Sequence, residues 1–166
     1  MTRRELEVTD QNEIQRILDT CKYLHLALVD DGKPYVVTLN YGYRMDPEDG
    51  HLILYLHGAT KGRKLDVIAK NPVCSFTMEC NVQPFTGKVA CQYGMSYESV
   101  SGSGHITMIE DAEERMDALQ CMMKTQTGRD DFAFDERMVS IVSVMRVDVM
   151  EYTAKKRPLP ESLRGC

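Results

Sequence analysis

The sequence predicts a mainly β protein, in which six or seven strands form one antiparallel sheet with two or three short helices beside it. Short runs rich in β-branched and aromatic residues recur along the chain, and Asp-Gly turns separate two pairs of them as hairpins. An antiparallel sheet of this length avoids open edges by curling into a barrel. With 166 residues and no linker or internal repeat, the chain fits one domain.

The first half of the chain predicts one helix and two hairpins. The helix is expected over residues 9–22, because Asp10 and Glu13 have capping-box spacing and an apolar stripe follows them. The pairs Asp31-Gly32 and Asp49-Gly50 supply the positive φ angles that tight hairpins need. Two successive hairpins predict an antiparallel meander, with strands at residues 23–29, 34–41 and 51–56.

The second half predicts more strands and the longest helix. That helix is expected from Asp111 to Gln126, with Gly128 as its stop signal. Residues 81–88 contain Pro84 and Gly87 and predict a loop, while the small residues at 101–104 predict a bulge within a strand. The domain should span residues 1–153 and be followed by an extended tail at 154–166. The strands are expected at residues 73–80, 89–93, 97–108 and 140–152.

A strand, a glycine-containing loop and a helix start predict an anion-binding site. The apolar strand ends at His57, the loop includes Gly62, and Arg63 and Lys64 lie in the first turn of a helix that should end before Pro72. Free N–H groups, the positive end of the helix dipole and two adjacent cations suit a phosphate group. The alternative is a solvated cationic first turn, which the dipole disfavours.

Composition and charge exclude several classes of function. A net charge of -5 and a pI near 5.4 argue against general nucleic-acid binding, which needs a basic surface. No apolar run approaches the ~20 residues of a membrane span, and residues 1–7 lack the apolar core of a signal peptide, so we expect a cytoplasmic protein.

The cysteines predict core thiols rather than a metal site. None forms a Cys-x-x-Cys pair, and none stands beside a histidine at zinc-site spacing, so no metal ligands are expected. Free cysteine behaves as a small hydrophobe in a reducing compartment. Cys166, at the C-terminal end, is expected to be exposed. The cysteines are Cys21, Cys74, Cys80, Cys91, Cys121 and Cys166.

Four segments in register resemble the flavin-binding split-barrel superfamily of pyridoxamine-phosphate-oxidase-like proteins, and within it the nitroimidazole-resistance branch. The resemblance runs from about Ile14 to Thr153. The segments are His57-Gly58-Ala59-x-x-Gly62-Arg63-Lys64-Leu65-Asp66 with Asn71-Pro72, Asp30-Asp31-Gly32-x-Pro34-Tyr35-Val36-Val37-x-Leu39-Asn40-Tyr41-Gly42, Tyr97-x-Ser99-Val100 with Gly102 and Gly104, and Ala112-Glu113-Glu114-x-x-x-Ala118-Leu119.

The resemblance implies a split barrel that is a homodimer with FMN at the subunit interface. It implies that Arg63 and Lys64, beside Gly62, bind the FMN phosphate. It also implies that the strand Val37-Thr38-Leu39-Asn40 runs beside the isoalloxazine ring and the ribityl chain. Ser99 and Val100 would complete the phosphate or ribityl contacts, and His57 would lie near the flavin and the substrate.

Several of these residues also have a structural interpretation. Thr38 and Asn40 fit ordinary outward-facing strand residues, and Ser99 fits a strand serine. His57 fits a hydrogen-bonded histidine at a strand end, and His25, within an apolar strand, fits a structural role better than a functional one. The methionine pair Met122-Met123 fits a core position better than a cofactor contact.

The resemblance predicts an FMN-dependent oxidoreductase that reduces a small organic acceptor, such as a nitroimidazole, with a nicotinamide or a protein as electron donor. His57 would orient or protonate the acceptor. Pyridoxal phosphate synthesis is not expected, because residues 147–157 lack the arginine-histidine substrate motif of true pyridoxamine-phosphate oxidases. The alternatives are a flavin-binding storage, sensing or electron-shuttle protein, and a barrel that holds deazaflavin or haem, with His57 or His25 as the axial ligand.

Overall fold

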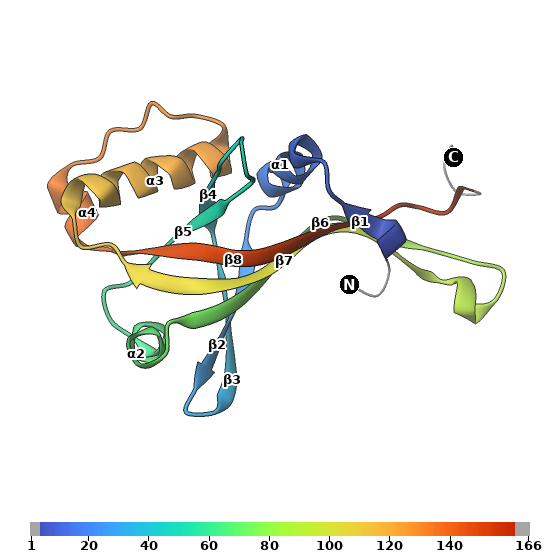
Figure 1. Ribbon diagram of the computed structural model, residues 1–166, viewed down its shortest axis with the longest axis horizontal. Coiled ribbons are helices and arrows are strands. Elements are labelled where there is room, and N and C mark those ends of the chain that lie inside the picture. The colour runs from blue at the N-terminus through green and yellow to red at the C-terminus, as the bar shows by residue number, and fades with distance from the viewer. Residues whose placement is uncertain (1–3, 162–166) are drawn as a thin grey trace.

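One antiparallel sheet organises the protein, and helices cover parts of it (Figure 1). The computed structural model describes residues 4–161. The strands are β1 (Glu7–Val8), β2 (Leu24–Asp30), β3 (Lys33–Leu39), β4 (Tyr41–Met45), β5 (Leu52–Gly58), β6 (Val73–Phe85), β7 (Gly94–Met108) and β8 (Ser143–Arg157). The helices are η1 (Arg4–Leu6), α1 (Gln11–Thr20), α2 (Arg63–Lys70), η2 (Ala90–Gln92), α3 (Ala112–Thr127) and α4 (Glu136–Ser140).

The strand order confirms a mainly β protein with the open seam of a split barrel. The eight-stranded sheet has the order β3-β2-β6-β7-β8-β5-β4, with β1 paired to the far part of β8. Within the described residues no ladder joins β3 to β4, so the sheet does not close into a continuous barrel. The count is higher than six or seven, because the 34–41 segment divides into two strands and β1 adds a short one.

The expected meander is wrong. The hairpins β2–β3 and β4–β5 both form, but they lie at opposite ends of the strand order. Only Asn40 separates β3 from β4 along the chain. Local pattern determines the pairing within a hairpin, whereas the position of a hairpin in the sheet depends on the long strands β6, β7 and β8, which come later in the sequence.

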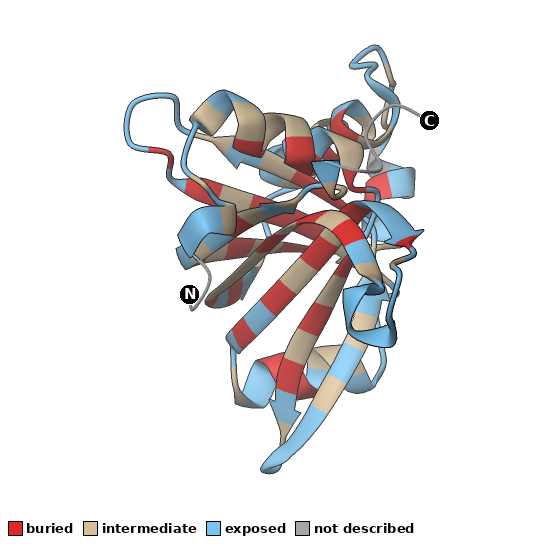
Figure 2. Cartoon of the chain, turned by 90° about the vertical axis from the view of Figure 1, so that its right-hand side faces the viewer, coloured by how far each residue is buried: buried red, intermediate tan, exposed pale blue. Residues whose placement is uncertain are grey.

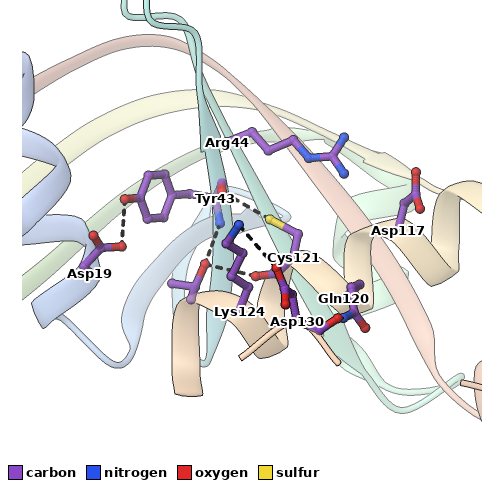
Figure 3. Close-up of a pocket in the computed structure, with 9 residues that line it drawn as sticks. Asp19, Tyr43, Arg44, Asp117, Gln120, Cys121, Lys124 and Asp130 are labelled. Carbon is purple, nitrogen blue, oxygen red and sulfur yellow. Dashed lines mark hydrogen bonds and ion pairs between the residues drawn. The ribbon is translucent and has the colours of Figure 1, made fainter. Parts of the chain in front are cut away.

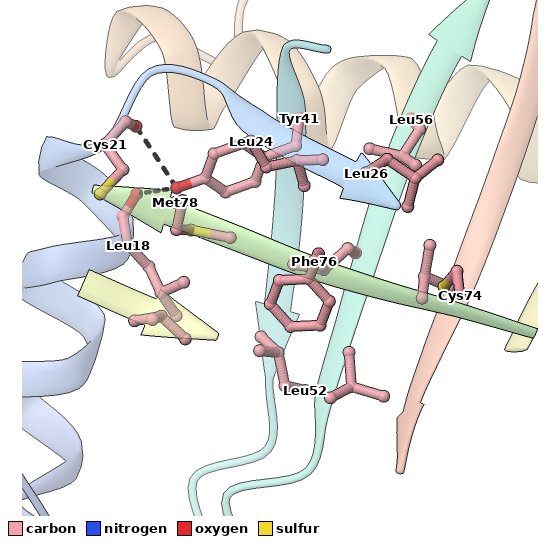
Figure 4. Packing of buried hydrophobic residues seen from close by; sticks show 14 of the residues in the cluster. Leu18, Cys21, Leu24, Leu26, Tyr41, Leu52, Leu56, Cys74, Phe76 and Met78 are labelled. Atoms are coloured by element: carbon pink, nitrogen blue, oxygen red, sulfur yellow. Dashed lines mark hydrogen bonds between the residues drawn. The ribbon is translucent and has the colours of Figure 1, made fainter. Parts of the chain in front are cut away.

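Buried and more exposed residues alternate along the strands, as a sheet with a core on one face requires (Figure 2). The inner core lies within the curl of the sheet, where α1 covers it, and Tyr41 crosses it to donate a hydrogen bond of 2.6 Å to the Leu18 carbonyl of α1 (Figure 4). Residues of this core include Ile14, Ile17, Leu18, Leu24, Leu26, Leu28, Leu52, Leu54, Leu56, Met78 and Val100.

A second, outer core lies where α3 crosses β4, β5 and β8 (Figure 1). Gly42 of β4 permits this crossing, since a Cβ there would lie 2.5 Å from the backbone Cα of Met122 in α3. Alternation along β5 therefore sends Leu54 and Leu56 inward but Tyr55 and His57 outward, toward α3. The outer core comprises Tyr55, Ile109, Ala118, Leu119, Met122, Val139 and Val144.

Caps and turns form as the sequence predicts. Asp10 is the N-cap of α1 and accepts from the Asn12 N–H, although Glu13 pairs with Arg16 instead of closing a capping box. Gly128, at φ 75°, ends α3 in the left-handed conformation. Asp31 and Gly32 have φ values of 48° and 81°, which match the right-handed twist of the β2–β3 hairpin.

The region from Asn81 to Tyr93 differs from the prediction. Strand β6 continues through Pro84 to Phe85, past a register shift between Cys80 and Gln83, and the expected strand at 89–93 is the 3₁₀ helix η2. The expected bulge in β7 is confirmed by a register shift between Ser103 and Gly104. Strand β8 reaches Arg157, so residues 154–157 of the expected tail belong to the sheet. Helix α4 was not predicted.

A buried carboxylate fastens α1 to the far part of the sheet. Glu98 of β7 is only 7% exposed. Its oxygens lie 2.7 Å from Arg16 Nη2 and 3.4 Å from Lys156 Nζ, and they accept from Asn81 Nδ2 at 2.7 Å. Glu13 of α1 shares the same two cations. The sequence gives no periodic signal for this four-charge cluster, because its members are far apart along the chain.

Within residues 4–161, no helix is long and apolar enough to cross a membrane.

Replacing Glu98 with Gln should lower the free energy of unfolding at pH 7 by roughly 2 kcal/mol, because a buried charge-assisted acceptor is lost. Hydrogen bonds from Arg16 and Lys156 lower the pKa of Glu13 from 4.5 to about 2, and burial opposes but does not cancel a similar lowering for Glu98. The unfolded chain therefore binds these protons first, and wild-type stability should fall as pH drops from 4.5 to about 2.

Urea unfolding at pH 7 and pH 3 measures both effects, with Glu151→Gln as an exposed control. The Glu98→Gln protein should lose less stability between these pH values than the wild type. An equal acid loss in the two proteins would contradict this assignment.

Candidate functional site

Two pockets adjoin at the seam between β3 and β4. The first, which we call the anion pocket, has a volume of about 330 Å³ and lies between β3 and the start of α2. Leu39 lines the anion pocket, and the next residue, Asn40, lines the second pocket. The anion pocket is lined by Tyr35, Val37, Thr38, Leu39, Ala59, Lys61, Gly62, Arg63, Lys64 and Leu65.

The start of α2 presents hydrogen-bond donors to the anion pocket. Gly62 is the N-cap, and its φ of 133° is a conformation that side-chain-bearing residues rarely adopt. Its carbonyl accepts from the Leu65 and Asp66 N–H groups, while Gly62 has no side chain to cap the first N–H groups of the helix. The predicted strand-loop-helix unit is therefore confirmed, with free backbone donors beside Arg63 and Lys64.

Arg63 is held at the mouth of the anion pocket by two contacts. Its Nε donates to Asp30 Oδ2 at 2.9 Å, and its guanidinium lies 4.3 Å from the Tyr35 ring centroid. The side chain is 56% exposed, so this ion pair stabilises the fold only weakly. The terminal Nη groups, which suit an oxyanion, are not engaged by Asp30. Arg63 is thus a fixed cation whose Nη groups are free of Asp30.

Lys64 is a half-buried cation without an acidic partner. Among the described residues no carboxylate lies within ion-pair distance of its ammonium. Burial lowers the pKa of Lys64 from its ordinary value. Its Nζ occupies the space over Gly58, where an added Cβ would overlap it. A desolvated, unpaired ammonium is costly, so this position favours a bound anion over a solvated helix turn.

The second pocket, which we call the apolar pocket, has a volume of about 340 Å³ and lies between β5 and α3. His57 is its main ionisable group. The Nδ1 atom of His57 is buried and has no hydrogen-bond partner, so the interpretation of His57 as a satisfied structural histidine fails at that atom. Burial, and then the charge of Lys64, lower the pKa of His57. The lining is Asn40, His57, Leu119, Met122, Met123, Gln126, Phe134, Met138 and Val142.

The strand segment expected beside the ligand does run along both pockets, but two of its side chains are engaged by the protein. Val37 and Leu39 also pack against the inner core. The exposed Thr38 lies 3.2 Å from His25 Nδ1, whose Nε2 lies 3.2 Å from Glu79 Oε1. Asn40 donates to the Lys22 carbonyl at 3.2 Å. Thr38 and Asn40 each line a pocket while also making a polar contact within the protein, and Asn40 lies in the link between β3 and β4. His25 has the structural role expected of it.

Ser99 and Val100 do not join the other predicted site residues. Val100 is fully buried in the inner core. Ser99 lies on the outer face of the sheet, the same face as His25, and lines a separate depression with Tyr97 and Lys155. Adjacent strand residues point to opposite faces, so one ligand does not contact both side chains. Within one protomer, neither residue lines the anion pocket or the apolar pocket.

Sequence reasoning missed the side of the site formed by α3 and the segment that follows it. Met122 and Met123 were expected in the core; Met122 is buried in the outer core, yet both line the apolar pocket. Phe134 and Met138 come from the unpredicted segment that includes α4. Tyr35 alternates with Val37 along β3, and this period of two is the one signal that could have placed it in the anion pocket.

A third pocket is a poorer candidate, although its volume of about 430 Å³ is larger (Figure 3). Its polar groups are partly engaged already: Lys124 lies 3.7 Å from Asp130, and Asp19 accepts from the Tyr43 hydroxyl at 2.8 Å. Burial raises the pKa of Cys121, so its thiol is not an activated nucleophile. The lining is Asp19, Tyr43, Arg44, Asp117, Gln120, Cys121, Lys124, Thr125 and Asp130.

Three of the five described cysteines are buried core thiols as expected, whereas Cys91 is not. Cys21, Cys74 and Cys80 are buried, Cys121 is half-buried and Cys91 is exposed. Cys166 lies outside the described residues. In residues 4–161 no group of three His, Cys, Asp or Glu side chains is placed to hold a metal ion.

Comparisons with known proteins agree with this architecture. A family model described as pyridoxamine 5'-phosphate oxidase matches residues 10–156. The structure of a proposed 5-nitroimidazole antibiotic resistance protein from Bacteroides thetaiotaomicron is 30% identical with a TM-score of 0.76, covering 90% of this chain and 86% of that one. None of the curated proteins matches the sequence.

Two further structures share the fold at lower identity. The flavocytochrome Anf3 from Azotobacter vinelandii is 18% identical with a TM-score of 0.76, covering 96% of this chain and 73% of that one. An FAD and heme binding protein from Mycobacterium smegmatis is 19% identical with a TM-score of 0.74, covering 93% and 75% respectively. Together with the family match, these structures confirm the resemblance drawn from the sequence.

Substitutions at the two neighbouring cations should change stability in opposite directions. Lys64→Met removes a half-buried, unpaired charge and should raise the free energy of unfolding of the ligand-free protein by about 1 kcal/mol. Arg63→Met removes the contacts with Asp30 and Tyr35 and should lower it by about 1 kcal/mol. Urea unfolding without added anion measures the change in stability for each variant. If Lys64→Met destabilises the protein, the ammonium of Lys64 already has favourable contacts within the protein.

Proposed function

From the premise that this chain belongs to the pyridoxamine 5'-phosphate oxidase family, we propose that it binds FMN and acts as an oxidoreductase toward a small organic acceptor. The observation that carries the proposal is Lys64, a half-buried ammonium without a carboxylate partner. It stands where a phosphate-binding helix start meets an apolar pocket. Charge at one end and apolar surface at the other match a phosphorylated aromatic ligand.

The anion pocket fits a phosphate monoester. Lys64 offers a point charge, Arg63 offers its terminal Nη donors, and the first N–H groups of α2 point into the same space. A phosphate with nearly two negative charges would replace the missing counter-ion of Lys64. The third pocket holds three carboxylates against two cations and does not suit such a group.

The apolar pocket fits a flat aromatic ring system. Its walls are methionine, leucine, phenylalanine and valine side chains, and its volume of about 340 Å³ is within the range of small-ligand sites. Leu39 and Asn40 link the two pockets along one extended strand, the path that a ribityl chain would follow. Two structural neighbours, a flavocytochrome and an FAD and heme binding protein, support the proposal that the ligand is a flavin.

The proposal includes a homodimer whose second copy completes the site. Ser99 and Lys155 share a half-exposed depression on the outer face of the sheet, separate from the anion pocket of their own protomer. Polar groups on this surface are available to a ligand held by another copy. A two-fold pair is the commonest assembly of this kind.

The residues around the site would bind, orient and shield. FMN supplies the electron transfer when bound, and a nicotinamide or a protein would be its donor. Met122, Met123 and Phe134 exclude water from the apolar pocket, and the flexible methionines adapt to acceptors of different shape. His57 holds or gives up a proton at the wall of that pocket. A nitroimidazole is the acceptor favoured by the neighbour that is 30% identical.

Haem is the second candidate ligand, because an unpartnered imidazole nitrogen lies in an apolar setting and one structural neighbour is an FAD and heme binding protein. His25, the other axial candidate from the sequence, lies on the outer surface of the sheet between Thr38 and Glu79. A haem in the apolar pocket would therefore have His57 as its one histidine ligand from this protomer.

A comparison of FMN with riboflavin tests the phosphate assignment, because the two differ only in the phosphate. Quenching of flavin fluorescence should show FMN binding at least 10-fold more tightly than riboflavin, and both Arg63→Ala and Lys64→Met should remove most of this difference. Lys70→Met, at the other end of α2, is the matched control and should retain it. Equal affinity for both flavins in the wild type would refute the phosphate site.

A turnover assay with the FMN-loaded protein distinguishes a catalyst from a flavin store. Mixed anaerobically with a nicotinamide donor and a nitroaromatic, an oxidoreductase turns over many equivalents per protomer. A protein that stays fully loaded yet consumes no more than one equivalent of donor is a flavin store or shuttle.

A further inference from the structure

We propose that Lys64 couples the two pockets, so that an anion bound in the anion pocket protonates His57 in the apolar pocket. Lys64 would then be a positioning residue that acts through the imidazole, in addition to binding the anion. This inference rests on the proposed function, because it requires a phosphate group beside Lys64.

The placement of Lys64 makes such coupling unavoidable. Its side chain lines the anion pocket, but its ammonium extends over Gly58, the residue that follows His57 on β5. Glycine at this position leaves the space that the ammonium occupies, since a Cβ would overlap it. One cation thus lies against the anion pocket and against the strand end that carries His57.

His57 faces little other charge. The elements packed around it contribute Asn40 from the β3–β4 link, apolar residues and Gln126 from α3, and apolar residues from the segment after α3. Its partner on β8 is Val144. Among the described residues around His57, Lys64 is the one ionised side chain that perturbs it, and it lowers the pKa of His57 in addition to burial. The state of Lys64 therefore controls the electrostatic potential at the imidazole.

A bound phosphate would reverse this potential. Without the anion, the ammonium repels a second proton on His57, and burial adds to that penalty. A phosphate with nearly two negative charges overcompensates the single charge of Lys64, and an opposite charge at this range favours the imidazolium. The pKa of His57 should then rise by about one unit, with the proton taken from solvent.

With this coupling, His57 would act as a proton donor mainly when the cofactor phosphate is bound. In the ligand-free protein burial and the charge of Lys64 disfavour a second proton on His57, whereas the phosphate-bound protein would hold that proton up to a higher pH at the wall of the apolar pocket. An acceptor in that pocket would then meet a charged donor more often when the anion pocket is filled. Reduction of a nitro group consumes protons, so such a donor has a direct use.

Titration of the histidine Cε1–H signals by NMR tests the coupling in the intact protein. The His57 signal is assigned from His57→Gln, and pH titrations are recorded without ligand, with inorganic phosphate, with FMN and with riboflavin. The pKa of His57 should rise by about one unit with phosphate and with FMN, but not with riboflavin. In Lys64→Met it should be raised already without ligand and should not respond to phosphate, whereas Lys64→Arg and Lys70→Met should behave like the wild type.

Calorimetric titration with phosphate on the same samples separates the two hypotheses. Measured phosphate binding with an unchanged His57 pKa would overturn the coupling and leave the proposed function standing. No binding of phosphate or FMN would overturn both. A His57 pKa that rises equally with riboflavin would also overturn the coupling, because the ring rather than the anion would then be the cause. The wild-type titrations decide these cases even if Lys64→Met does not fold.

Discussion

The rest of the structure depends on one short connection. Strands β3 and β4 are the two ends of the strand order, yet only Asn40 separates them along the chain. A link of one residue keeps the Cα atoms of Leu39 and Tyr41 within about 7 Å, so the sheet must curl until the end of β3 meets the start of β4. Tyr41 then reaches the inner core and bonds to the end of α1, and Gly42 lets α3 approach β4 at backbone distance. The curl, the core and the seam follow from this one constraint.

The candidate site lies at this seam because the two edges of the sheet bring different functional side chains to it. The β3 edge brings the start of α2 with Arg63 and Lys64, and the β4–β5 hairpin brings His57 under α3. The fold leaves Lys64 half-buried without a carboxylate and leaves His57 Nδ1 without a partner. By contrast, the buried carboxylate Glu98 is compensated by Arg16 and Lys156. A half-buried cation and an unpartnered imidazole nitrogen beside adjoining pockets are the expected mark of a ligand site.

Short-range sequence signals predicted most helices, strands and turns. The features that were not predicted depend on packing between segments far apart in the sequence. Asp31-Gly32, the Asp111 cap and the Gly62–Arg63 helix start are short-range features, so they are visible in the sequence. Residues 81–85 include Pro84 but extend β6 because residues 83–85 pair with β7, whereas residues 90–92 form η2. Within the site, Arg63, Lys64 and His57 were identified from one contiguous segment, whereas Met122 and Phe134 come from segments that only the tertiary fold brings there. Val100 is buried in the inner core because its side chain follows the strand alternation.

A visible absorption spectrum of the purified protein, before any cofactor is added, tests the central claim that the seam holds a phosphorylated flavin. The account predicts a two-banded flavin spectrum and the release of FMN, rather than riboflavin or FAD, on denaturation. A colourless protein that also fails to take up added FMN would contradict it, and a sharp Soret band would replace flavin with haem.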